Sequence, residues 1–192
     1  SNPHLITGLA TNTSYTLSAQ CDSATPSCFP PVTLTTGELH PMPYCEQFDS
    51  YGSGNGNYPT GWTHLTATGD DYLYTTSGNN WSLYFRSYYY NQNTLTAVLP
   101  DLDIDSLRHA SIELRYRFEG NSCPSYIGIQ TDPNDTTTFT PLQQLQTTLN
   151  TWHTDRISLA DYTGDGRFLA IRMQGNNTYY KHLYIDYIYV QD

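Results

Sequence analysis

Hydrophobic and polar residues alternate most regularly between Ile112 and Glu119. Successive side chains of a β-strand point to opposite faces, so this alternation predicts a half-buried strand. The apolar face would consist of Ile112, Leu114, Tyr116 and Phe118. The other face would carry Glu113, Arg115, Arg117 and Glu119. We expect the apolar face to join a core, and the charged face to be solvated with weak cross-strand pairs or to line a groove.

The run from Leu183 to Val190 is the most β-prone of the chain and contains one misfit, Asp186. With strict alternation Asp186 shares a face with Ile188 and Val190, and the opposite face is apolar as well. A strand that is apolar on both faces is typical of the centre of a sandwich, so we expect Asp186 to be buried. A buried carboxylate needs backbone N–H donors, an arginine or a metal ion, because an uncompensated charge in a dry site costs several kcal/mol.

Further short strands with turn residues between them follow one another along the chain. They are expected at Trp81–Phe85, Ser125–Thr131, Thr138–Leu145, Trp152–Leu159 and Phe168–Gln174. Threonine and tyrosine, which favour strands, are abundant, and no stretch repeats apolar residues at helical spacing. The sequence therefore predicts an all-β fold with almost no helix, arranged as a jelly-roll β-sandwich.

Residues 1–36 resemble the closing strands of a fibronectin type III domain through Thr13-x-Tyr15 and the ending Thr35-Thr36-Gly37. In such sandwiches a tyrosine at this corner ties its hydroxyl to the backbone upstream, and Tyr15 would take that role. The stretch 37–43 contains one glycine and two prolines and predicts a linker. Residues 44–192 would then form a second domain.

Composition excludes one class of partner. Eight Lys and Arg stand against 18 Asp and Glu, which gives a formal net charge of −10. Binding to nucleic acid needs cations that neutralise phosphates, so this charge argues against it. No run approaches the roughly 18 apolar residues needed to cross a bilayer.

The four cysteines, Cys21, Cys28, Cys45 and Cys123, lack the close spacing of a metal site. Three disulfide pairings are possible. Proximity along the chain favours Cys21 with Cys28, which would leave Cys45 with Cys123. Four reduced, buried thiols are the alternative.

Six motifs in order resemble one known family. They are Glu46-x-Phe48-Asp49, Pro59-x-Gly61-Trp62, Leu95-x-x-Val98-Leu99-Pro100, Trp152-x-x-x-x-Ile157-Ser158-Leu159, Tyr162-x-Gly164-x-Gly166-Arg167-x-x-Ala170-Ile171-Arg172 and Tyr184-Ile185-Asp186-x-Ile188. Together they resemble the cleaved-adhesin or choice-of-anchor jelly-roll domains of Bacteroidetes surface and secreted proteins, which are related in fold to MAM domains. The resemblance spans about residues 44–190. It implies a sandwich of the concanavalin or galactose-binding type.

The resemblance also implies a function and a metal. Such domains are extracellular or on the cell surface, act in adhesion or carbohydrate binding, and often hold a structural calcium ion between the opening and closing strands. Glu46 or Asp49 and Asp186 occupy the matching acidic positions. The chain departs from the family in having Gly69-Asp70-Asp71 and a single aspartate in the last strand. The candidate calcium ligands are therefore Glu46, Asp49, Asp70, Asp71 and Asp186.

No residue set specifies an enzyme. The six histidines are scattered, and neither an HExxH motif nor a Gly-x-Ser-x-Gly elbow occurs. We therefore expect a non-catalytic module, and a glycosidase is the least favoured alternative. The surplus of tyrosine beside asparagine suits sugars, because ring faces cover C–H patches while amides bond hydroxyls. The candidate ligand-binding residues are Tyr88, Tyr89, Tyr90, Asn91, Tyr179 and Tyr180.

The expected partner is a glycan or a host or surface protein, bound by a monomer. The alternative is a structural spacer or protein-interaction domain with no ligand beyond calcium. A row of exposed rings would favour glycan, whereas a flat apolar patch would favour a protein.

Overall fold

The computed structural model describes residues 6, 8–10, 13–18, 31–65, 72–78, 81–88, 93–175 and 180–192. The chain divides into two compact units, Ser1–Leu39 and His40–Asp192. The division falls inside the stretch 37–43 that the sequence predicts as a linker. Both units contain β-strands, and the described residues contain no α-helix, only the 3-10 turns η1 (Leu107–His109) and η2 (Thr136–Thr138). No helix there is long and apolar enough to span a membrane.

The first unit contains an antiparallel pair, β1 (Ser14–Leu17) and β2 (Val32–Thr35). The hydroxyl of Tyr15 accepts a hydrogen bond from the backbone N–H of Ala10 over 2.8 Å. The tie predicted for Tyr15 to the backbone upstream is therefore present.

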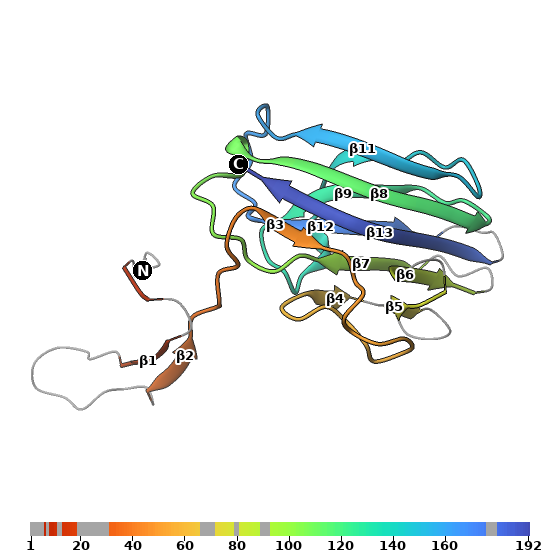
Figure 1. The fold of residues 1–192 in the computed structure, drawn as a ribbon. Helices are drawn as coiled ribbons and strands as arrows, with labels where there is room; N and C mark the ends of the chain where they lie inside the picture. The colour runs from red at the N-terminus through yellow and green to blue at the C-terminus, as the bar shows by residue number, and fades with distance from the viewer. Residues whose placement is uncertain are drawn as a thin grey trace, which may run out of the picture. The chain divides into compact units, whose positions relative to one another are not determined.

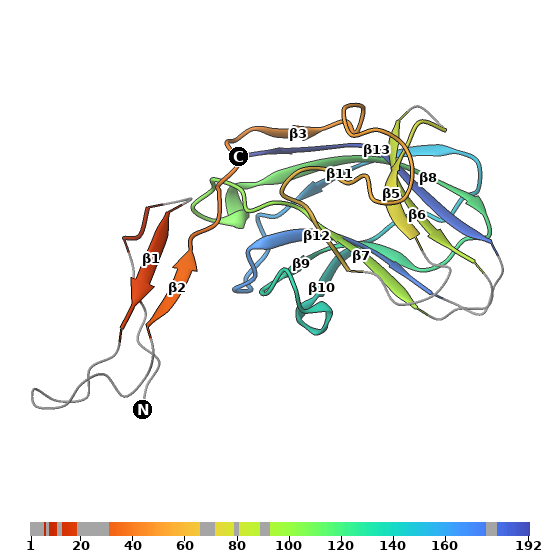
Figure 2. The ribbon, with the colours of Figure 1, turned by 90° about the horizontal axis from the view of Figure 1, so that it is seen from below.

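The second unit is a sandwich of two antiparallel sheets (Figures 1 and 2). The front sheet has the order β11 (Trp152–Ser158), β8 (Ser111–Gly120), β13 (Lys181–Gln191), β6 (Ser82–Ser87) and β5 (Tyr72–Thr76), and β3 (Tyr44–Glu46) also pairs with β13. The back sheet has the order β10 (Thr140–Gln144), β9 (Ser125–Gln130), β12 (Phe168–Gln174), β7 (Thr94–Val98) and β4 (Thr63–Leu65). Figure 2 shows the two layers edge-on. The predicted all-β jelly-roll sandwich is confirmed.

The core lies between the two sheets, where apolar side chains of both inner faces meet. On β8 it takes Ile112, Leu114, Tyr116 and Phe118, each at most 1% exposed. The alternation predicted for this strand is thus confirmed, and its four charged residues face outward. Burying a large apolar side chain contributes roughly 1.5 to 3 kcal/mol, so this strand is a major source of stability.

Strand β13 departs from the predicted alternation at Asp186. Its register with β8 pairs Ile185 with Tyr116 and Tyr187 with Arg115, so Asp186 is the extra residue of a β-bulge. The bulge inverts the alternation. As a result the four apolar residues Leu183, Ile185, Ile188 and Val190 all face the core and are fully buried. The prediction that both faces of this strand are apolar is wrong, whereas the predicted burial of Asp186, at 7% exposure, is confirmed.

The proposed disulfide between Cys45 and Cys123 is also wrong, because both thiols are free. On β3 the residues Tyr44 and Glu46 are buried, so Cys45 between them faces outward and is exposed. Cys123 lies in the core at 2% exposure. Sequence separation gave no indication that the sheet would place the two sulfurs on different sides. Cys21 and Cys28 lie outside the described residues.

Candidate functional site

The outer face of the front sheet carries a row of four aromatic side chains and one arginine that crosses five strands. Cross-strand pairing places Tyr74 beside Tyr84, Tyr84 beside Tyr184, Tyr184 beside Arg117, and Arg117 beside Trp152. We call these five residues the aromatic row. It spans about 19 Å, because neighbouring strands lie about 4.8 Å apart. Figure 1 shows the front sheet from this side.

Direct ring contacts hold the aromatic row together. Tyr84 and Tyr184 stack with centroids 4.6 Å apart, and Tyr74 meets Tyr84 edge-on at 5.3 Å. The guanidinium carbon of Arg117 lies 5.4 Å from the ring centres of both Tyr184 and Trp152. Arg117 also donates to Glu119 over 2.7 Å. Stacked rings and a cation between two rings fix one another's orientation, so the row is preorganised.

The middle of the aromatic row is more buried than its ends. Tyr84 and Tyr184 are each 7% exposed, while Tyr74 and Trp152 are half-buried. Burial raises the pKa of Tyr84, and the neighbouring Tyr184 raises it further, so this hydroxyl stays protonated. The row therefore has a buried centre and two more accessible ends, each of which carries an aromatic ring.

A second row runs alongside and contains Tyr72, Arg86, His182 and Glu119, again by cross-strand pairing. The guanidinium carbon of Arg86 lies 5.3 Å from the centre of the Tyr72 ring and 4.1 Å from that of Tyr88. The sequence provides one usable signal for both rows, because Tyr72 and Tyr74, and likewise Tyr84 and Arg86, are spaced by two and so share a strand face.

The two tyrosine segments predicted to bind ligand meet in space where they are described. The rings of Tyr88 and Tyr180 lie 4.6 Å apart in an edge-to-face arrangement, although they are remote in sequence. Tyr180 is 41% exposed. The remaining predicted members, Tyr89, Tyr90, Asn91 and Tyr179, lie outside the described residues. Sequence reasoning missed the aromatic row itself, because the partners of each strand were unknown.

Two predicted calcium ligands, Asp49 and Asp186, line one small cavity of about 250 Å³ on the same side of the front sheet. An oxygen of Asp186 lies 2.5 Å from a guanidinium nitrogen of Arg115. The cavity is completed by Gln47, Trp81 and Tyr187.

Glu46, a third predicted ligand, is buried and already hydrogen-bonded. One of its carboxylate oxygens accepts from the Phe48 N–H and the other from the Tyr51 hydroxyl, each over 2.7 Å. Asp70 and Asp71 lie outside the described residues. Within the described ranges no group of three or more His, Cys, Asp or Glu side chains could hold a metal ion.

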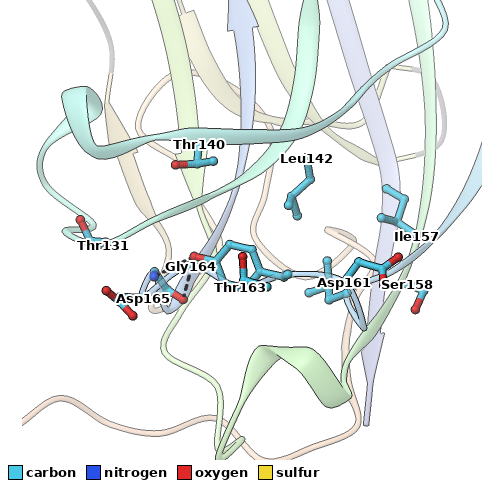
Figure 3. A pocket seen from close by; sticks show the side chains of 12 residues that line it. Thr131, Thr140, Leu142, Ile157, Ser158, Asp161, Thr163, Gly164 and Asp165 are labelled. Atoms are coloured by element: carbon cyan, nitrogen blue, oxygen red, sulfur yellow. Dashed lines mark hydrogen bonds between the residues drawn. The ribbon is translucent and has the colours of Figure 1, made fainter.

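A larger cavity of about 500 Å³ opens beside the loop between β11 and β12 (Figure 3). Polar side chains from this loop and from β10 line it, among them Asp161, Thr163 and Thr140. The hydroxyl of Tyr162 accepts from the Gly166 N–H over 2.7 Å. A Cβ at Gly164 would lie 2.5 Å from that hydroxyl, so a larger residue there would require the Tyr162 side chain to shift. The volume suits a small molecule, but Tyr162 is the single aromatic side chain among the described residues that line it, whereas the outer sheet carries a row of them.

No protein-family model matches the chain, and no curated protein matches it. Solved structures do match. The K2 cleaved adhesin domain of Lys-gingipain aligns with a TM-score of 0.60 at 12% identity, over 79% of this chain and 98% of that one. A family 29 carbohydrate binding module from Piromyces equi aligns with a TM-score of 0.50 at 14% identity, over 79% of this chain and 92% of the module.

An Endo-D glycoside hydrolase domain from Streptococcus pneumoniae R6 also aligns, with a TM-score of 0.50 at 11% identity, over 68% of this chain and 21% of that one. At these identities the likeness concerns the fold. The second unit is therefore a jelly-roll sandwich of the kind found in an adhesin domain and in a carbohydrate-binding module.

Proposed function

We propose that this protein is a non-catalytic carbohydrate-binding or adhesion module that works outside the cell or at its surface. The ligand would lie on the outer face of the front sheet, along the aromatic row. The observation that carries the proposal is the continuous sequence of side chains Tyr74, Tyr84, Tyr184, Arg117 and Trp152 across five strands.

The chemistry of this face suits a sugar chain. Aromatic rings cover the C–H patches of sugar rings, and guanidinium and carboxylate groups bond the hydroxyls. A row of about 19 Å exceeds one sugar ring, which favours an oligosaccharide. The face also carries charged side chains between its rings, unlike the flat apolar patch that a protein partner would favour.

The fold supports the same proposal. One matching structure is a cleaved adhesin domain and another is a carbohydrate binding module. The first is named for adhesion and the second for carbohydrate binding.

Titration calorimetry with soluble neutral and acidic oligosaccharides tests the proposal. We expect at least one glycan to bind with a measurable heat, and binding to weaken when Trp152 is replaced by alanine. Since Trp152 lies on the row, its fluorescence should also change on binding. If a broad glycan panel gives no binding to the folded protein, the proposal fails.

The calcium ion implied by the resemblance does not fit the described residues well. Calcium takes six to eight oxygen ligands, whereas Asp49 and Asp186 are the two carboxylates at the shared cavity and Arg115 pairs with one of them. Thermal melts in excess EDTA and in millimolar calcium test this. We expect equal melting temperatures. A rise with calcium would mean that ligands beyond the described ranges complete a site around these two residues.

A further inference from the structure

Three of the four arginines on the outer face of the front sheet are paired with carboxylates. Arg115 pairs with Asp186 at 2.5 Å, Arg117 with Glu119 at 2.7 Å and Arg156 with Glu113 at 2.7 Å. The fourth is Arg86, and none of the residues that the structure describes forms a salt bridge with it. Among the described residues Arg86 is thus a half-buried guanidinium with no paired carboxylate, and such a group suits an anion.

Aromatic contacts hold the Arg86 guanidinium in place without neutralising it. It lies 4.1 Å from the Tyr88 ring centre and 5.3 Å from that of Tyr72. Burial acts to lower the pKa of Arg86, but hydrogen bonds to Tyr88 and Tyr74 and the nearby Tyr84 outweigh it, so the pKa rises. Stacking uses the flat face of a guanidinium, and the N–H donors along its edge match the oxygens of a carboxylate or sulfate.

The described neighbours of Arg86 on the adjacent strands do not cancel its charge. His182, its partner on β13, has a pKa lowered by burial and is neutral at pH 7. Both ring nitrogens of His182 are buried and have no hydrogen-bond partner in the described part of the chain. Outward-facing charges on the five long strands of this sheet are four arginines against three carboxylates, namely Arg86, Arg115, Arg117 and Arg156 against Glu113, Glu119 and Asp186. On these strands the outward-facing arginines thus outnumber the carboxylates by one, although the chain has a net charge of −10.

We infer that the glycan bound on this face is acidic, and that Arg86 binds its carboxylate or sulfate group. The inference rests on the proposed function. The aromatic row would bind the sugar rings, and Arg86 in the adjacent row would select for the negative charge. A uronic acid and a sulfate ester present the same chemistry here, an anionic oxygen group on a sugar.

Pairs of ligands with the same sugar backbone, one charged and one neutral, separate the contribution of charge to the affinity from that of sugar shape. Oligogalacturonate and its fully methyl-esterified form differ in the carboxylate charge and one methyl group per sugar, and a sulfated galactan and its desulfated form differ only in the sulfate. Each would be titrated by calorimetry into the full chain and into the variants Arg86→Gln and Arg86→Lys. Arg156→Gln is the control, since it removes one positive charge from the same face at an exposed, paired position.

We expect an acidic member to bind more tightly than its neutral partner, and Arg86→Gln to weaken the acidic member by about tenfold or more. Arg86→Lys should recover part of the affinity, and Arg156→Gln should stay within about twofold of the wild type. The pair that shows the difference identifies carboxylate or sulfate as the group bound. Equal affinity within both pairs, or equal effects of Arg86→Gln and Arg156→Gln, would refute the inference while leaving glycan binding in place. Binding of no glycan at all would refute the proposed function as well.

Discussion

The guanidinium of Arg115 lies 2.5 Å from the carboxylate of Asp186, which is 71 residues further along the chain. The bulge at Asp186 directs the chain so that the two side chains meet on the outer face of the front sheet. The Asp186 side chain is 8% exposed and that of Arg115 is 36% exposed. The two side chains thus lie in different environments. Removing one of them should therefore not change the stability by the same amount as removing the other.

We predict that Arg115→Gln destabilises the protein more than Asp186→Asn does. The first substitution takes the cation away from a buried carboxylate, whereas the second leaves a guanidinium that water can partly reach. The expected losses in the free energy of unfolding are about 2 to 3 kcal/mol and about 1 kcal/mol. Urea denaturation measures both. Arg156→Gln, which breaks an exposed pair, should cost less than about 0.5 kcal/mol. The reverse order for the first two variants would contradict the prediction.

Substitutions in the aromatic row should weaken glycan binding, whereas a substitution at the larger cavity should not. We predict that Tyr74→Ala and Trp152→Ala each weaken the ligand found in the binding screen by about tenfold, because each removes a ring face from an accessible end. The control is Asp161→Ala, which alters the larger cavity beside the loop between β11 and β12. Calorimetry on the three variants shows whether the ligand binds at the aromatic row or at that cavity. Loss of affinity confined to Asp161→Ala would move the site to that cavity.

Stability should fall as the pH is lowered from about 7 to about 5. Burial lowers the pKa of His182 and of His64 below the usual 6.5, so the unfolded chain takes up protons in this range while the folded one does not. These histidines therefore contribute their whole stabilisation above about pH 6.5. The free energy of unfolding decreases as the pH falls from there through the lower pKa of the folded state. Glu113, whose pKa is lowered by hydrogen bonds from Tyr187 and Arg156, loses its stabilising effect only below its ordinary 4.5.

Urea denaturation at several pH values tests this linkage. His182→Gln should flatten the decrease, since glutamine cannot be protonated, while the wild type keeps it. A wild-type stability that rises on acidification to pH 5 would disprove the prediction.

Gly128 on β9 should not tolerate alanine. A Cβ there would lie 2.4 Å from the Phe139 ring and 2.5 Å from the Thr140 carbonyl oxygen, and the latter belongs to the paired strand β10. We predict a loss of at least about 2 kcal/mol in the free energy of unfolding, because the backbone must shift. The comparison is Gly78→Ala, where the added Cβ makes only an ordinary contact and the change should stay within about 1 kcal/mol. Similar melting temperatures for the two variants would contradict the close approach.

The sequence by itself determined the features that depend on local chemistry. Alternation along residues 112–119 assigned the core and outer faces of β8 correctly, since side-chain direction in an unbroken strand follows from the backbone alone. The abundance of strand-forming residues indicated an all-β sandwich, and Tyr15 was expected to tie back to the chain upstream. The burial of Asp186 was predicted from apolar neighbours on the same face, but the bulge places it on the opposite face, beside Arg115.

The tertiary structure alone decided which strands lie side by side and in what register. The bulge at Asp186 reversed the predicted faces of β13, because one extra residue inverts a period of two. The aromatic row, the place of Arg86 beside it and the separation of Cys45 from Cys123 all depend on pairings between strands remote in sequence. Such pairings are fixed by the packing of the whole sandwich, and a local pattern of side chains carries no information about its distant partner.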